Sequence, residues 1–136
     1  MKRTLLLNRH LSALIARLGH LDEIVVADAG LPMPDNVEVI DLAIIPGLPR
    51  FVDVLRALRT ELIIESAVHA SEAAPDLIDD MQKELDIWSR ECDQKISFQG
   101  IPHQDFKRRS ANAKAVIRTG EVIPYANIIL ISGVAF

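Results

Sequence analysis

A histidine stands where a helix is expected to end, in a position from which a loop can present it to a ligand. His20 follows an apolar stripe that stops at Leu18, with Gly19 between them in the left-handed position that commonly ends a helix. An imidazole, with an unperturbed pKa of about 6.5, donates and accepts protons near neutral pH. His20 is therefore a candidate acid–base group. A histidine here can equally cap the last carbonyl groups of the helix, and its position alone leaves both interpretations open.

Asp28 closes a short apolar strand, Ile24–Ala27, that the sequence predicts to be buried. A carboxylate in that place needs a hydrogen-bond partner, because burying an unpaired charge is costly. The partner is either an amide of the loop Ala29–Pro34 or a hydroxyl group of a ligand. Ligands bind at strand ends in open α/β sheets, so we favour the ligand.

The segment Tyr125-Ala126-Asn127 contains the only tyrosine of the chain. An aromatic ring can cover the C–H face of a sugar, while an amide exchanges hydrogen bonds with its hydroxyl groups. The simpler alternative is a turn in which Asn127 bonds its own backbone, and these three residues by themselves favour that alternative.

The remaining histidines are less informative. His103 follows Pro102 at the expected start of a helix, as an exposed residue or as part of a site. We expect His10 and His69 to be surface or core residues. The histidines lack the close spacing of a zinc site, and the glycine-rich loops that bind nucleotides are missing, so we expect neither a metal nor a cofactor.

The composition limits the class of protein. Its 136 residues fit one domain, residues 1–136, and 49% hydrophobic with 25% charged residues is typical of a globular protein. Lys and Arg number 15 against 19 Asp and Glu, and this net charge of -4 argues against nucleic-acid binding.

We expect no membrane span or signal peptide, since the apolar runs are too short. The single cysteine, Cys92, fits a reducing cytoplasm.

Helices that alternate with short apolar strands predict an α/β fold, a single domain with a central mixed β-sheet of short strands flanked by helices. Helical spacing occurs in residues 11–18 after a cap at Asn8, and in 51–58, 75–88 and 103–114. Strands are expected over residues 24–27, 37–42, 62–69, 96–98, 115–117 and 128–131. The apolar run 133–136 is expected to pack against the core or against a partner subunit.

Taken in order, these segments resemble the D-ribose pyranase family, sugar mutarotases found with bacterial ribose uptake systems. The matching stretches are Leu18–His20, Asp28–Pro34, His103 with Phe106-Lys107, Ala115–Glu121, Pro124–Leu130 and Gly133-Val134. The resemblance runs from the first helix to residue 134, although residues 60 to 100 carry little of it. The fucose mutarotase relatives share the Gly-His pair but have glycine at the position of Ala126, so this chain looks like the ribose form.

The resemblance implies that His20 is the proton donor. It also implies that the sugar is bound by Asp28, His103, Tyr125, Ala126 and Asn127. Members of the family form a ring-shaped homo-oligomer, a decamer of two pentamers, whose sites are completed by the C-terminal segment of a neighbouring subunit. We therefore expect a homodecamer with sites at subunit interfaces and free ribose as the partner.

Interconversion of pyranose and furanose forms, and of anomers, passes through the open-chain aldehyde. Opening the ring needs a proton at the ring oxygen and loss of another from the anomeric hydroxyl, and a well-placed histidine speeds such transfers by roughly 10²–10⁴-fold. In this scheme Asp28 holds hydroxyl groups or orients His20, and His103 is a second proton carrier or a hydroxyl ligand. The alternatives are a mutarotase for fucose or another monosaccharide, and a non-catalytic sugar-binding protein that accompanies a transporter.

Overall fold

The computed structural model describes residues 1–136 and contains every helix and strand that the apolar spacing predicts. The helices are α1 (Arg9–Arg17), α2 (Phe51–Arg59), α3 (Pro75–Cys92) and α4 (His103–Ser110). The strands are β1 (Glu23–Ala27), β2 (Glu38–Asp41), β3 (Ile64–Ala70), β4 (Ser97–Ile101), β5 (Ala115–Arg118) and β6 (Ile128–Ser132). Helix α4 ends earlier than predicted. None of the helices is long and apolar enough to cross a membrane.

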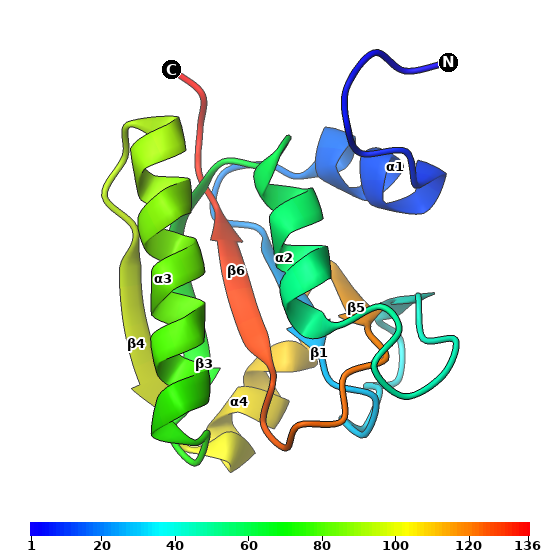
Figure 1. Ribbon diagram of the computed structural model, residues 1–136, viewed down its shortest axis with the longest axis vertical. Coiled ribbons are helices and arrows are strands. Elements are labelled where there is room, and N and C mark those ends of the chain that lie inside the picture. The colour runs from blue at the N-terminus through cyan, green and yellow to red at the C-terminus, as the bar shows by residue number, and fades with distance from the viewer.

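The six strands form one mixed sheet in the order β2-β5-β1-β6-β3-β4. Five strands are parallel to one another, and β6 runs antiparallel between β1 and β3. The carboxyl ends of these five strands therefore share one edge with the start of β6. We call this the carboxyl edge, and we call the opposite edge, where β6 ends, the amino edge. In Figure 1 the carboxyl edge lies toward the bottom and both chain termini lie at the top.

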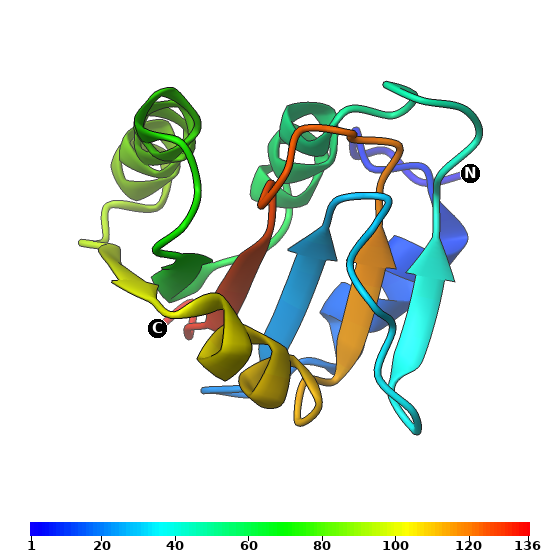
Figure 2. The same ribbon diagram turned by 90° about the horizontal axis from the view of Figure 1, so that it is seen from below.

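Helices cover both faces of the sheet, as Figure 2 shows from below, with α2 and α3 on one side and α4 on the other. The larger core lies between the sheet and α1, α2 and α3, and the smaller core lies under α4 around Phe106. Side chains of β1 alternate between them: Ile24 and Val26 enter the larger core, Val25 and Ala27 the smaller. A strand buried on both faces reads as the continuous apolar run seen in the sequence.

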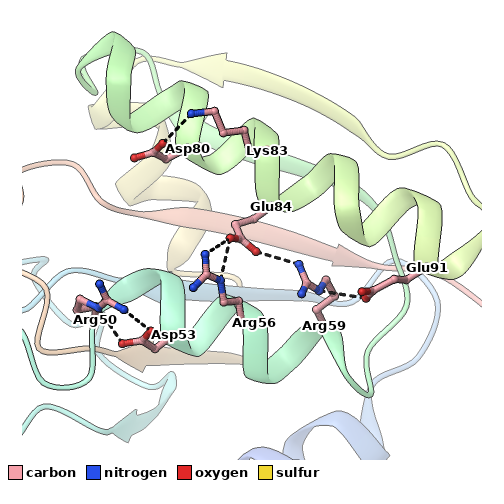
Figure 3. Close-up of polar contacts among 8 residues, drawn as sticks. All are labelled: Arg50, Asp53, Arg56, Arg59, Asp80, Lys83, Glu84 and Glu91. Carbon is pink, nitrogen blue, oxygen red and sulfur yellow. Dashed lines mark hydrogen bonds and ion pairs between the residues drawn. The ribbon is translucent and has the colours of Figure 1, made fainter.

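A cluster of charged side chains joins α2 to α3 (Figure 3). Glu84 of α3 is only 6% exposed and accepts hydrogen bonds from Arg56 at 2.7 and 2.9 Å and from Arg59 at 2.9 Å. Arg59 also pairs with Glu91 at 3.0 Å. Since each oxygen of the buried carboxylate has a guanidinium partner, the charge is compensated where the two helices meet.

The turn that leads into β1 differs from the expected one. Asn8 caps α1 as predicted, accepting hydrogen bonds from the backbone of His10 and Leu11. The prediction of a left-handed Gly19 is wrong: the helix ends at an extended Leu18, and the left-handed residue is Leu21, with φ 66°. The reason lies in tertiary hydrogen bonds. Leu21 donates its N–H to the carbonyl of Ser132 at 2.9 Å, which bends the chain onto the end of β6.

Candidate functional site

A cavity of about 520 Å³ opens at the carboxyl edge of the sheet. Its walls are the loop after β1, the first residue of α4 and the segment that leads into β6. The lining residues are Asp28, Ala29, Gly30, Leu31, Pro32, His103, Glu121, Val122, Ile123, Pro124, Tyr125 and Asn127. Of the six predicted site residues, four therefore share one pocket: Asp28, His103, Tyr125 and Asn127. The antiparallel β6 makes this meeting possible, because its start lies beside the end of β1.

Asp28 and Asn127 hold each other through two hydrogen bonds. The backbone N–H of Asp28 donates to Oδ1 of Asn127, and Nδ2 of Asn127 donates to Oδ2 of Asp28, both at 2.8 Å. The other carboxylate oxygen of Asp28 accepts the N–H of Gly30 at 2.9 Å. Both residues are buried, at 9% and 1% exposure. Asp28 thus has the loop amide that one alternative required, and its oxygens keep further lone pairs for a ligand.

The local turn considered for Asn127 is not what the structure contains. Its side chain bonds to Asp28, which is 99 positions away in the sequence, instead of to its own backbone. A short γ-type contact does exist beside it, because the N–H of Asn127 donates to the carbonyl of Tyr125 at 2.7 Å. The side chain of Asn127 is consequently fixed by tertiary structure.

His103 and Tyr125 form an aromatic corner of the pocket. Their rings meet edge to face, with centroids 5.0 Å apart and planes at 81°. The backbone of Tyr125 is left-handed, with φ 64°, a conformation that is uncommon for a bulky residue and that often marks functional positions. Nδ1 of His103 is buried without a hydrogen-bond partner. The other ring nitrogen, Nε2, is therefore the one available to a ligand.

Ala126 lies beside these residues but does not line the pocket. Its side chain is fully buried in the larger core, and its N–H donates to the carbonyl of Ile123 at 3.2 Å. A contact between this residue and a sugar would have to use the main chain.

Glu72, to which the sequence analysis gave no role, positions His103. Helix α4 begins after Pro102 without a side-chain cap of its own. Instead, both carboxylate oxygens of Glu72, in the loop after β3, accept the backbone N–H of His103, at 3.0 and 2.9 Å. This backbone hydrogen bond holds the pKa of Glu72 below its usual value of 4.5. No local sequence pattern reveals such a cap, because cap and helix are 31 positions apart.

Glu121 is the second functional residue that sequence reasoning left without a role. It is 9% exposed and lies in the pocket wall. The signal that could have identified it resembles the one used for Asp28: a carboxylate a few residues after the buried strand β5 needs hydrogen-bond partners if it is buried too.

His20 lies at the amino edge, away from the pocket. Strand β1 separates it from Asp28, and five strand residues span roughly 17 Å. Its Nε2 is 2.9 Å from Oε2 of Glu65, and its side chain is 51% exposed. The turn that contains His20 is fixed by Asp22, whose Oδ2 accepts the N–H of Gly19 at 2.8 Å, a bond that lowers the pKa of Asp22. Asp28 therefore does not orient His20 of the same chain.

Comparisons with known proteins agree over the full length. A model of the RbsD / FucU transport protein family matches residues 1–135. The D-ribose pyranase of Aeromonas salmonicida (strain A449) is 47% identical over 139 residues, covering all of both chains. The solved structure of Bacillus subtilis RbsD complexed with D-ribose is 46% identical, with a TM-score of 0.85 over all of both chains. The fucose mutarotase of Streptococcus pneumoniae, solved with L-fucose, is 23% identical over 98% of this chain and 99% of that one, with a TM-score of 0.79, and shares the fold.

Proposed function

The chain belongs to the RbsD / FucU transport protein family, and from this membership we propose that it is a D-ribose pyranase. It is then an isomerase of ribose catabolism that interconverts the pyranose and furanose forms, and the anomers, of free ribose. Residues 1–136 act as one sugar mutarotase domain. The observation that carries the proposal is the pocket shared by Asp28, His103, Tyr125 and Asn127, in a chain 47% identical over its full length to a D-ribose pyranase.

The pocket has the chemistry that a free sugar needs. The paired Asp28 and Asn127 present oxygens in fixed directions to hydroxyl groups, at low entropic cost because both side chains are already bonded to each other. The ring of Tyr125 offers a face for the C–H groups of the sugar. Nε2 of His103 can exchange a hydrogen bond or a proton with a hydroxyl or with the ring oxygen, which makes it our candidate for the second proton carrier.

We propose that His20 donates the proton. Because His20 lies at the amino edge, away from the pocket of its own chain, we propose that each pocket receives the His20 of a neighbouring subunit. His20 and the C-terminal segment share that edge, since Leu21 donates to Ser132 just before Gly133. A neighbour that presents its amino edge to the pocket therefore brings both elements together. Contact of one edge with the opposite edge of the next subunit is heterologous, and such contacts form a ring where the rotation between subunits closes.

The surface beside the pocket supports an interface. Five large apolar side chains are between 49% and 74% exposed there, and we call them the apolar rim: Ile44, Ile45, Leu48, Val122 and Ile123. Apolar side chains gathered in this way mark sites of protein association. A decamer of two pentamers is the proposed assembly. A cytoplasmic location is likewise our proposal, which the thiol of the single Cys92 suits.

Magnetisation-transfer NMR on ribose tests the function and the role of His20 together. The wild-type protein should speed exchange between pyranose and furanose signals, and His20→Ala should lower the rate by about 100-fold or more. His10→Ala is the matched control, because His10 is an exposed histidine of α1 that lies outside the site. A wild-type protein that leaves the exchange of ribose unchanged while speeding that of fucose would overturn the assignment of substrate.

If His20→Ala keeps full activity, the proton donor is another group and the function itself stands. If the protein binds ribose with an affinity that does not depend on His20 and accelerates no sugar, it is a binding protein and the proposed activity is wrong.

A further inference from the structure

Glu121 is a buried carboxylate whose bonds all go to the main chain. Oε1 accepts the N–H groups of Val122 at 3.0 Å and of Ile123 at 3.1 Å, and Oε2 accepts the N–H of Phe51 at 3.3 Å. Glu121 forms no salt bridge. Backbone N–H groups supply all its hydrogen bonds, and the charge of Arg50 interacts with it only through space. It lines the sugar pocket on one side and a second cavity, between α2 and α3, on the other.

The hydrogen bond from Phe51 gives the start of α2 an acceptor that its own cap residue lacks. Arg50 precedes this helix and provides no side-chain cap, because a guanidinium has donors but no acceptor for helix N–H groups; it pairs instead with Asp53 at 2.9 and 3.0 Å. The first N–H groups of a helix need acceptors, and a negative charge is favourable at this end of the helix dipole. Glu121 supplies both from 70 positions away in the sequence.

The main chain of Glu121 is also tied to the loop that carries Asp28. Its carbonyl accepts the N–H of Ala29 at 2.8 Å, and its N–H donates to Oγ1 of Thr119 at 3.2 Å. One residue thus connects the helix start, the loop after β1 and the pocket wall.

The pocket wall beyond Glu121 has few other anchors. Val122 and Ile123 are 61% and 49% exposed, and their N–H groups are held by the carboxylate. The next hydrogen bond along the segment is the one from Ala126 to the carbonyl of Ile123. Tyr125 lies within this stretch, so its position depends on the order of the stretch, whereas Asn127 is also held by Asp28.

We propose that Glu121 is a positioning residue of the sugar site, one that fixes the wall 121–125 against α2 before the sugar arrives. This inference rests on the proposed function. If the wall is already ordered, binding of the sugar does not have to include the entropic cost of ordering the wall. Loss of the carboxylate should therefore weaken binding and leave the rates of proton transfer nearly unchanged.

Two variants separate positioning from folding. Glu121→Ala removes every side-chain bond, and we expect the KM for ribose to rise about tenfold while kcat stays within about twofold. Glu121→Gln keeps an oxygen for Val122 and Ile123, so it should restore most of the affinity. In sugar-free protein, amide hydrogen exchange at Val122 and Ile123 should be faster in Glu121→Ala than in wild type.

Glu84→Gln is the matched control, because Glu84 is also a buried carboxylate that contacts α2, on the flank that Figure 3 shows. Its KM for ribose should equal that of the wild type. If Glu121→Ala lowers the melting temperature but leaves KM unchanged, Glu121 is only a helix cap. If kcat falls instead of KM rising, Glu121 acts on the reacting atoms, and the positioning role is wrong.

The hydrogen-exchange measurement distinguishes failure of this inference from failure of the proposed function. Unchanged exchange at Val122 and Ile123 in Glu121→Ala would overturn the inference even in an active enzyme. A wild-type protein that leaves ribose exchange unaltered would overturn the function, whatever the order of the wall.

Discussion

Polar side chains at the two edges of the sheet differ in their burial and in their hydrogen bonding. At the carboxyl edge, Asp28 and Asn127 are buried and bonded to each other. At the amino edge, the side chain of His20 is half exposed and has one partner, Glu65. In the function that we propose, this difference corresponds to two tasks. Rigid recognition requires buried polar groups with satisfied bonds, whereas a proton carrier must stay accessible to substrate.

A single strand connects these two edges. His20 precedes β1 and Asp28 follows it, so the strand acts as a spacer of fixed length between the proposed proton donor and the proposed binding pair of one chain. If the site is shared between subunits, each β1 contributes to two different sites.

The largest effect is expected when two impaired variants are mixed, which tests whether a site combines the pocket of one subunit with His20 of another. His20→Ala keeps the pocket and should lose about 100-fold or more in exchange rate. Asn127→Ala keeps the proposed proton donor and should lose exchange rate through its weaker binding of ribose. In mixed assemblies made from equal amounts, about a quarter of the sites should combine an intact pocket with an intact His20 from a neighbour, if each site pairs two subunits of a ring. Exchange of ribose measured by NMR should recover to that fraction. No recovery in verified mixed assemblies would mean that each site lies within one chain.

Breaking the Asp28–Asn127 pair should weaken recognition. Asn127→Ala leaves the buried N–H and carboxylate of Asp28 without their partner, and we expect ribose affinity to fall about tenfold or more, as judged by isothermal titration calorimetry. Asn112→Ala, an exposed asparagine after α4, is the control. An Asn127→Ala protein with wild-type affinity would show that the pair is only structural.

Glu84→Gln should affect stability without affecting the sugar site. The variant removes the charge that Arg56 and Arg59 share, and thermal unfolding should show a Tm lower by about 5 °C. Ribose exchange below the transition should be normal. A loss of activity in the folded variant would indicate that the flank of α2 and the pocket are coupled.

The smallest expected effect concerns pH at the start of α4. Because the pKa of Glu72 is lowered in the folded protein, its carboxylate stabilises this helix start above its usual value of 4.5, and that contribution is lost as the pH falls below 4.5. Amide exchange at His103, corrected for its intrinsic pH dependence, should show weaker protection in acid. Glu72→Gln should be less protected at neutral pH and should lack the acid step. An identical step in both proteins would assign it to another group.

The helices and strands could be predicted from the sequence because the spacing of their apolar residues is a local property. The continuous run Ile24–Ala27 predicted a doubly buried strand, and Asn8 predicted the start of α1. Asp28 could be selected because it stands at the end of a buried strand, whereas His103, Tyr125 and Asn127 were selected only through the family resemblance.

The features that could not be predicted depend on pairing between distant residues. The strand between His20 and Asp28 places them at opposite edges, but which other residues meet each of them follows only from the order of strands in the folded sheet. Glu72 and Glu121 cap helices far along the chain, and Leu21 takes the left-handed position because of its bond to β6. Local propensity contains no information about such partners.

The place of β6 has a consequence for how the protein is made. It is the last of the six strands to leave the ribosome, yet it lies between β1 and β3 and joins the two halves of the sheet. Until it is synthesised, β2, β5 and β1 cannot connect to β3 and β4, and both halves keep an open edge. Asn127 precedes β6 directly, so the nascent chain acquires its binding pair and its continuous sheet in the same final step.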